Sequence, residues 1–439
     1  MKRAEKIAAA LVALLVCWLH LPTAERGPWP PRFSSFTLSN GLEADYLQGK
    51  TSALSVVQVL VRGGSRMDPA GREGLTCLTL SLVLQIPDST LVHRLMEMGS
   101  TYYQSLENDY GLITIVCQSR FLDETLKIIC PVMADPLLSG LRINAIKDHM
   151  KALQKSENDQ PLDRLRLLLA QAFFAGTPCG HSAYGNADSL KAITRDDIAA
   201  SHRALFCSGN LKVAAASDLD EPAVREIISR RFAAFASGPA VAPPPAAANA
   251  NPPKELNQRL EQKQSHIAIA WRLGGAEPLG ANVIRGVLLE TLLGQGAGSR
   301  LWALRSRQDL AYAFGAFDLN LSCGSLFCVY VKTESGRGGE GLAALRNILA
   351  DLWQNGVDEG EFAATQTMAE ADLLRRSESK EQLSALPLRL EGLGLGAAFA
   401  DGFASRLRSV SREEFNAFLR SALSPEGRME ITIGPEAAK

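Results

Sequence analysis

The hydrophobic residues in the first half of the chain follow two spacings, one typical of strands and one of helices. In the segment 54–62, Val57, Val59 and Val61 stand at every second position, which places them on one face of a β-strand. Between such segments the apolar residues recur at helical spacing. The pattern predicts, in chain order, a strand at 54–62, a helix at about 74–84, a strand at 112–117 and a helix from Leu122 that stops near Pro131.

The second half of the chain repeats this plan. Its predicted elements are a strand at 267–271, a helix at about 283–293, a strand at 326–331 and a helix that carries Leu342, Leu345, Leu349 and Leu352. Corresponding elements lie about 210 residues apart, which indicates an internal duplication. The strands and helices do not alternate as regular βαβ units. We therefore expect an α+β fold of two homologous domains, each an antiparallel or mixed sheet covered by helices.

A change in composition separates the two halves. Residues 238–254 are rich in proline and alanine, and no periodic apolar face survives there. Prolines favour an extended, semi-stiff connector. We therefore predict an N-terminal domain at 34–237, a linker at 238–254 and a C-terminal domain at 255–436. The 439 residues, 46% of them hydrophobic, are enough for two buried cores.

The N-terminus carries the pattern of a targeting signal. Lys2, Arg3 and Lys6 precede an apolar run at 7–19, which is shorter than the roughly 20 residues of a membrane span. We predict a signal peptide within residues 1–24, and the alternative is an uncleaved anchor formed by 7–19. In both cases we expect the globular part to be outside the cytoplasm, secreted or periplasmic.

Charge and cysteine content narrow the range of functions. The chain has 46 Lys and Arg, 47 Asp and Glu, and a formal net charge of -1. Because it has no long run of like charge, nothing suggests binding to nucleic acid or to an anionic membrane surface. Several cysteines lie in apolar runs, which is typical of buried thiols. In an oxidising compartment Cys323 and Cys328 could pair, but the sequence leaves their pairing open.

A glycine-rich segment in the first half carries a resemblance to a known family. Residues 63–69 (Gly-Gly-Ser-Arg-Met-Asp-Pro) and 71–75 (Gly-Arg-Glu-Gly-Leu) are similar to the lead-in to the active-site helix of the pitrilysin/insulinase zinc peptidases, which include mitochondrial processing peptidases. In catalytic members a His-x-x-Glu-His motif follows, in which the histidines hold zinc and the glutamate polarises the zinc-bound water. Here Cys77 replaces the first histidine, Leu80 the glutamate and Ser81 the second histidine.

The other expected metal ligands are also missing. The third ligand of the family is a glutamate on a later helix, but the matching region, 151–155, has no carboxylate, and Glu157 lies too close to the following turn. A catalytic zinc needs three protein ligands, and Cys77 has no neighbouring base to make it a nucleophile. We expect no metal site in this chain, and only core packing for the helix that carries Cys77. The alternative is a metal site assembled from scattered positions.

The resemblance extends along nearly the whole chain. Residues 36–42 are similar to the family's opening strand and contain an Asn-Gly tight turn. Residues 180–198 match closely, and within them Thr194 and Asp197 have the spacing of a helix cap. Catalytic members carry an edge strand that pairs with substrate. At that place Thr101-Tyr102-Tyr103 stands instead of the usual Leu-Asn-Ala, which argues against peptide pairing there.

The most informative segment lies in the second half. The glycine-rich turn at 294–298 and the stretch 304–312 resemble the arginine/tyrosine element of the family. In catalytic assemblies this element comes from the C-terminal domain or from a partner chain, and it faces the zinc. The match assigns its two side chains to Arg305 and Tyr312. A guanidinium and a phenol can donate hydrogen bonds to the oxyanion that develops on an attacked peptide carbonyl.

The resemblance implies a non-catalytic subunit of a heterodimeric zinc peptidase. A homologous partner subunit would carry His-x-x-Glu-His and the zinc, and this chain would bind no cofactor of its own. It would close the peptide chamber and contribute Arg305 and Tyr312 to substrate binding and oxyanion stabilisation. Substrates would be extended or unfolded peptides. The alternative is a scaffold or peptide-binding protein with no role in catalysis, in which both side chains are relics.

Overall fold

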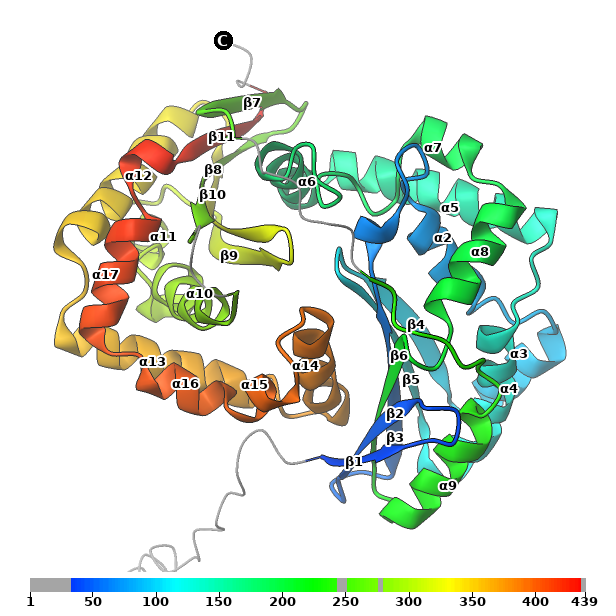
Figure 1. Cartoon of the computed structure of the whole chain (residues 1–439). Coiled ribbons are helices and arrows are strands. Elements are labelled where there is room, and N and C mark those ends of the chain that lie inside the picture. The colour runs from blue at the N-terminus through cyan, green and yellow to red at the C-terminus, as the bar shows by residue number, and fades with distance from the viewer. Residues whose placement is uncertain (1–32, 243–250, 275–278, 436–439) are drawn as a thin grey trace, which may run out of the picture.

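The computed structural model describes residues 33–242, 251–274 and 279–435. It has two β-sheets, one in each half of the chain, and helices form the outer layer of both halves (Figure 1). This arrangement confirms the predicted α+β fold. The segment 1–24, predicted as a signal peptide or anchor, lies outside the described residues. Within the described ranges, no helix is long and apolar enough to cross a membrane.

The first sheet has six strands in the order β1-β2-β6-β3-β5-β4. Their bounds are β1 Ser34–Thr37, β2 Glu43–Gln48, β3 Leu54–Arg62, β4 Thr101–Leu106, β5 Tyr110–Gln118 and β6 Leu211–Ser217. β2 and β6 run parallel, and the other neighbours are antiparallel. β3 begins and ends where the sequence pattern predicts, because it is a central strand in which Ser55 to Val61 are all buried.

The second sheet repeats this topology in the order β7-β11-β8-β10-β9. Its strands are β7 Glu255–Arg259, β8 Gln264–Leu273, β9 Ala313–Leu321, β10 Gly324–Glu334 and β11 Met429–Gly434. β7 runs parallel to β11, as β2 does to β6, and the remaining pairs are antiparallel. Each of these strands therefore has a counterpart in the first sheet, as expected of duplicated domains.

Helices fill the space around both sheets. In the first half they are α2 Leu75–Leu82, α3 Ser89–Glu97, α4 Leu122–Ala134, α5 Gly140–Asp159, α6 Pro161–Phe173, α7 Ala187–Ala192, α8 Arg195–Leu205 and α9 Glu221–Phe232. In the second half they are α10 Leu279–Gly294, α11 Trp302–Ser306, α12 Gly338–Asn355, α13 Glu359–Arg375, α14 Lys380–Gly392, α15 Ala397–Asp401, α16 Phe403–Ser409 and α17 Arg412–Ala422. Single 3₁₀ turns lie at Ser65–Met67, Ser119–Phe121, Gly296–Gly298 and Pro425–Gly427.

Two local predictions for the helices have different outcomes. The predicted cap of α8 is confirmed, because the Asp197 amide donates to the Thr194 hydroxyl and the Asp197 carboxylate accepts from the Thr194 amide. The predicted end of α4 is wrong. This helix continues through Pro131 to Ala134, because a proline in the last turn removes only one amide donor and leaves the following residues free to stay helical.

Two helices lie between the sheets, and each packs on the sheet of the other half (Figure 1). α6, from the first half, packs Leu165, Leu168 and Leu169 into one cluster with Ala268 and Ala270 of β8. The carbonyl of Phe173, at the end of α6, accepts a 2.5 Å hydrogen bond from Arg272, also on β8. The inner face of the second sheet is therefore covered by a helix from the first half.

α14 makes the reciprocal contact from the second half. Its Ala385 and Leu388 pack against Leu60 of β3 and Leu112 of β5. At the N-terminus of the helix, the Lys380 ammonium donates 2.7 Å bonds to two carbonyls in the loop before β3 and at its start. This burial of apolar surface makes the two halves one packed body.

Candidate functional site

The helix in the position of the family's zinc helix is part of the core. In α2, the side chain of Cys77 is 5% exposed and that of Leu80 is fully buried. Cys77 packs with Ile143, Ile146 and Met150 of α5. Burial, followed by the charge of Asp68, raises the pKa of the Cys77 thiol to about 12. A thiol of this pKa is protonated at neutral pH and is therefore a poor nucleophile.

The third degenerate position, Ser81, is tied to the neighbouring edge strand. Its hydroxyl lies 2.8 Å from the side-chain amide of Gln104 on β4. This contact keeps α2 beside β4. The three positions Cys77, Leu80 and Ser81 thus have structural roles, and their side chains do not fit a zinc ion.

The lead-in to α2 contains a buried carboxylate that the sequence did not single out. Asp68 accepts three 2.7 Å hydrogen bonds, from the amides of Gly74 and Thr76 and from the Thr76 hydroxyl. Burial raises the pKa of Asp68 to about 6, in spite of these bonds. Asp68 therefore fixes the start of α2 as an N-terminal cap would.

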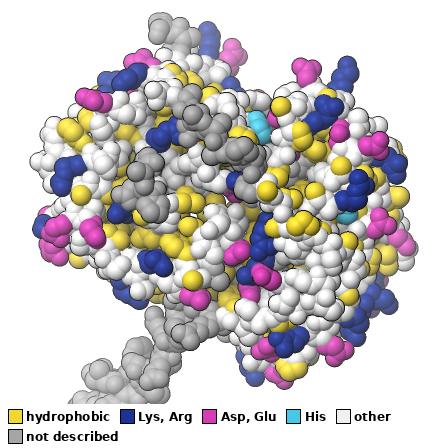
Figure 2. Space-filling view, in the orientation of Figure 1, with side chains coloured by type: hydrophobic (Ala, Val, Ile, Leu, Met, Phe, Trp, Pro, Cys, Tyr) yellow, Lys and Arg dark blue, Asp and Glu magenta, His cyan; other side chains and the backbone are white. Residues whose placement is uncertain are grey.

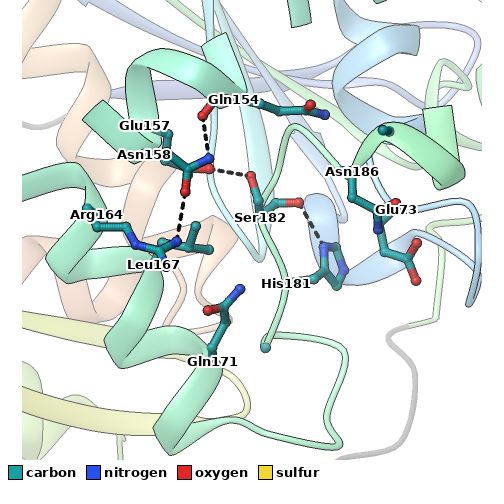
Figure 3. Close-up of a pocket in the computed structure, with 13 residues that line it drawn as sticks. Glu73, Gln154, Glu157, Asn158, Arg164, Leu167, Gln171, His181, Ser182 and Asn186 are labelled. Atoms are coloured by element: carbon teal, nitrogen blue, oxygen red, sulfur yellow. Dashed lines mark hydrogen bonds between the residues drawn. The ribbon is translucent and has the colours of Figure 1, made fainter. Parts of the chain in front are cut away.

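The region expected to hold the third zinc ligand borders a polar pocket of about 290 Å³ (Figure 3). Gln154 donates a 2.8 Å bond to the carbonyl of Tyr184, and Glu157 accepts a 2.7 Å bond from the Ser182 hydroxyl. Burial raises the pKa of Glu157. Nδ1 of His181 lies 3.0 Å from the Ser182 carbonyl. Sequence spacing missed this cluster because its members come from α5 and from the loop before α7.

No metal centre emerges from these groups. Within the described ranges, no three His, Cys, Asp or Glu side chains lie close enough together to hold a metal ion. Cys77, Glu157 and His181 therefore do not form a replacement for the lost zinc ligands.

Arg305 and Tyr312 lie on the second half and point to solvent. Arg305 is exposed near the end of α11, with its guanidinium 5.9 Å from the ring centre of Trp302. Tyr312 is 56% exposed, and only its backbone is fixed, by a 2.9 Å bond from its amide to the Lys332 carbonyl. Within the described residues, neither side chain forms a hydrogen bond or an ion pair, and neither meets α2. Both are free to contact another molecule.

The preceding glycine-rich turn is firmly anchored. Arg300 follows the 3₁₀ turn at Gly296–Gly298 and donates bonds of 2.7 and 2.8 Å to the Glu361 carboxylate. It also reaches Asp351 at 2.8 Å and the carbonyl of Gly356 at 3.1 Å. This network holds the segment that leads to Arg305 against α12 and α13.

A second feature that the sequence did not predict joins the two halves. Cys323, in the β9–β10 turn, forms a disulfide with Cys179 and not with Cys328. Cys328 is buried as a free thiol within β10, so its side chain faces the core. Beside the disulfide, Asp109 accepts from the backbone amide of Ser322 at 3.0 Å and from Arg66 at 2.9 Å. The β9–β10 turn is therefore fastened to the first half twice.

The chain resembles known proteins over most of its length. Residues 192–368 match the family model described as the peptidase M16 inactive domain. The chain is 26% identical over 253 residues to an uncharacterized zinc protease of Mycobacterium leprae, and this alignment covers 55% of the chain and 56% of that relative. It is 23% identical over 321 residues to the probable mitochondrial-processing peptidase subunit beta of Arabidopsis thaliana, covering 68% of the chain and 59% of that relative. The chain thus spans a little over half the length of these relatives.

A solved structure shares the whole fold. The crystal structure of a peptidase M16 inactive domain from Pseudomonas fluorescens superimposes with a TM-score of 0.79 at 18% identity, covering 92% of this chain and 98% of the other. Together with the family model and the curated relatives, it shows that this chain has the fold of the pitrilysin/insulinase (M16) peptidases and resembles them in sequence, whereas positions 77–81 lack the His-x-x-Glu-His motif.

Proposed function

We propose that this chain is the non-catalytic subunit of a heterodimeric zinc peptidase. One contrast supports the proposal. Cys77 and Leu80 of the zinc helix are buried in the core and Ser81 contacts Gln104 of the edge strand. Arg305 and Tyr312, by contrast, remain exposed and unpaired within the described residues. The M16 inactive-domain match is consistent with a non-catalytic role.

The contribution of this chain would be to bind and polarise the substrate. The partner would be a homologous subunit with His-x-x-Glu-His, whose zinc supplies the activated water. The guanidinium of Arg305 and the phenol of Tyr312 would donate hydrogen bonds to the carbonyl oxygen of an extended peptide. Such bonds strengthen as negative charge develops on that oxygen, and one such donor typically contributes about 10²-fold to the rate.

The same proposal places the chain outside the cytoplasm. The predicted targeting signal at 1–24 is one reason, and the disulfide between Cys179 and Cys323 is another, because disulfides persist in oxidising compartments. Whether the segment 7–19 is removed or stays as an anchor does not affect the assembly that we propose.

Reconstitution tests the proposed function. The chain should show no peptidase activity alone and should form a complex with an M16 subunit from the same organism that has an intact zinc motif. This complex should cleave unfolded peptides and lose activity with a chelator. Arg305→Ala and Tyr312→Phe should each lower the rate about 10²-fold without weakening the complex. Both side chains are exposed, so these variants should fold normally.

The competing function is that of a scaffold or peptide-binding protein. If the complex forms and both variants cleave peptides at the wild-type rate, Arg305 and Tyr312 have no catalytic role and the scaffold is the better description. If no zinc-bearing subunit binds the chain, the heterodimer itself is wrong.

A further inference from the structure

A cavity of about 480 Å³ opens between the first sheet and two helices of the second half. One wall is the face of β3, β4 and β5 that carries Gln58, Tyr103 and Leu112. The opposite wall is formed by the end of α13 and by α14, which packs on this sheet (Figure 1). The size is in the range of pockets that hold a small ligand or a few side chains of a peptide.

The cavity lies beside a free sheet edge. β4 is the last strand of the first sheet and, among the described residues, pairs with β5 alone. Thr101, Tyr103 and Ser105 are exposed, while Gln104 faces α2, where it contacts Ser81. Main-chain pairing depends on the free edge and not on side-chain identity, so the unusual residues of β4 do not prevent a peptide strand from adding there. Alternate side chains of such a peptide would point toward the cavity.

Arg389 is the unpaired charged group of this cavity. It is exposed on α14, and its guanidinium forms no hydrogen bond or ion pair within the described part of the chain. Arg376, by contrast, is 2.7 Å from Asp372, and Glu381 accepts from the Tyr103 hydroxyl. Figure 2 shows basic and acidic side chains gathered along the seam between the two halves.

Arg389 is close enough to the edge strand to affect its neighbours. Its charge lowers the pKa of Tyr103, although burial and the bond to Glu381 raise that pKa overall, to about 12. It also acts on Glu107, whose pKa is raised mainly by burial, but the two do not approach to ion-pair distance. The Arg389 guanidinium is therefore available to pair with a carboxylate of another molecule, because no carboxylate of the described part of the chain pairs with it.

We propose that this cavity is a peptide subsite in which Arg389 binds a carboxylate of the bound chain. The peptide lies along β4, and an acidic side chain or its C-terminal carboxylate forms a charge-assisted, bidentate pair with the guanidinium. The apolar walls, with Leu112, Leu383 and Leu386, cover the aliphatic part of the same residue. The subsite rests on the proposed peptide chamber and gives it a preference for acidic substrates.

Peptide binding to the full chain alone tests this subsite. The probe is a short fluorescein-labelled Thr/Ala peptide with one Glu, compared by anisotropy with the same peptide carrying Gln, each with a free and an amidated C-terminus. We expect the amidated Glu peptide to bind about tenfold more tightly than the amidated Gln peptide. If instead only the peptides with a free C-terminus bind more tightly, the carboxylate that pairs with Arg389 is the C-terminal one of the peptide. That result also supports the subsite.

Charge reversal provides the specific readout. Arg389→Gln should remove the preference, and Arg389→Glu should transfer it to the peptide with Lys in place of Glu. The matched control is Arg375→Gln on α13, because Arg375 is exposed, pairs with Asp372 at 3.3 Å and does not line the cavity. Melting curves check that all variants fold.

Three outcomes overturn the subsite. They are equal binding of Glu, Gln and free-acid peptides, equal effects of Arg389→Gln and Arg375→Gln, and no peptide binding by the full chain. Because this assay needs no partner, it separates the subsite from the heterodimer. A failed reconstitution with an intact acidic preference disproves only the heterodimer, and a working complex without that preference disproves only the subsite.

Discussion

Removal of the disulfide between the two halves should lower the stability of the whole chain. Cys179 and Cys323 are separated by 144 residues. In the chain-entropy description, a cross-link that closes a loop of this length restricts the unfolded state by about 5 kcal/mol. We expect a measured loss of about 2–4 kcal/mol, since unfolded chains retain some structure that reduces the entropic gain.

Denaturant unfolding in the presence and absence of a thiol reductant measures this effect. The oxidised wild type should lose stability on reduction, and the Cys179→Ala/Cys323→Ala variant should be less stable but insensitive to reductant. Cys328→Ala is the control, because Cys328 is buried in β10 without a disulfide. It should lose about 1 kcal/mol of packing and keep the response to reductant. A wild type that unfolds at the same denaturant concentration in both conditions would refute the reasoning.

Four further predictions concern single side chains. Burial lowers the pKa of His266 to about 4, so the unfolded state binds a proton at higher pH than the folded state does. The free energy of unfolding should therefore fall by on the order of 2 kcal/mol from pH 6.5 to 4. Denaturation at each pH should show a smaller fall in His266→Gln. Asp109→Ala leaves the Arg66 charge without its buried partner and should cost about 3 kcal/mol in the same assay, whereas an unchanged midpoint would contradict the ion pair. Asp309 has a φ of 46°, in the left-handed region that strains a residue with a side chain and favours glycine. Asp309→Gly should therefore raise the free energy of unfolding by about 1 kcal/mol, and the melting temperature with it. Cys77 should react with iodoacetamide only as fast as the chain unfolds, and rapid labelling would show that it is accessible.

Local features of the fold were predictable because their causes are local. The alternation of Val57, Val59 and Val61 gave the bounds of β3, and the Thr194–Asp197 spacing gave the start of α8. The end of α4 was misinterpreted because a proline affects the turn before it, through one missing amide donor, and the residues after Pro131 can stay helical as far as Ala134. The disulfide partner of Cys323 could not be predicted, because Cys179 is brought near it only by the packing of α6 on the other half.

In the candidate site, too, the features with a local cause were predictable from the sequence and those that depend on the tertiary fold were not. The loss of the zinc motif was visible at Cys77, Leu80 and Ser81, because the motif is a fixed spacing on one helix. The exposure of Arg305 and Tyr312 depends on how α11 leads into β9, which no spacing describes. The pocket around Glu157 and the cavity at Arg389 combine residues from distant segments, so neither leaves a pattern in the sequence.

The crossed position of α6 and α14 limits how this chain can be divided. Each half leaves the inner face of its sheet to be covered by a helix of the other, through Leu165 and Leu169 in one direction and Ala385 and Leu388 in the other. A cut within the linker at 238–254 would therefore expose one apolar sheet face and one apolar helix on each fragment. Neither fragment should be soluble by itself, and the two should recover the fold only when they are expressed together. We therefore expect the two halves to unfold together as one cooperative unit, although their sheets have the same topology.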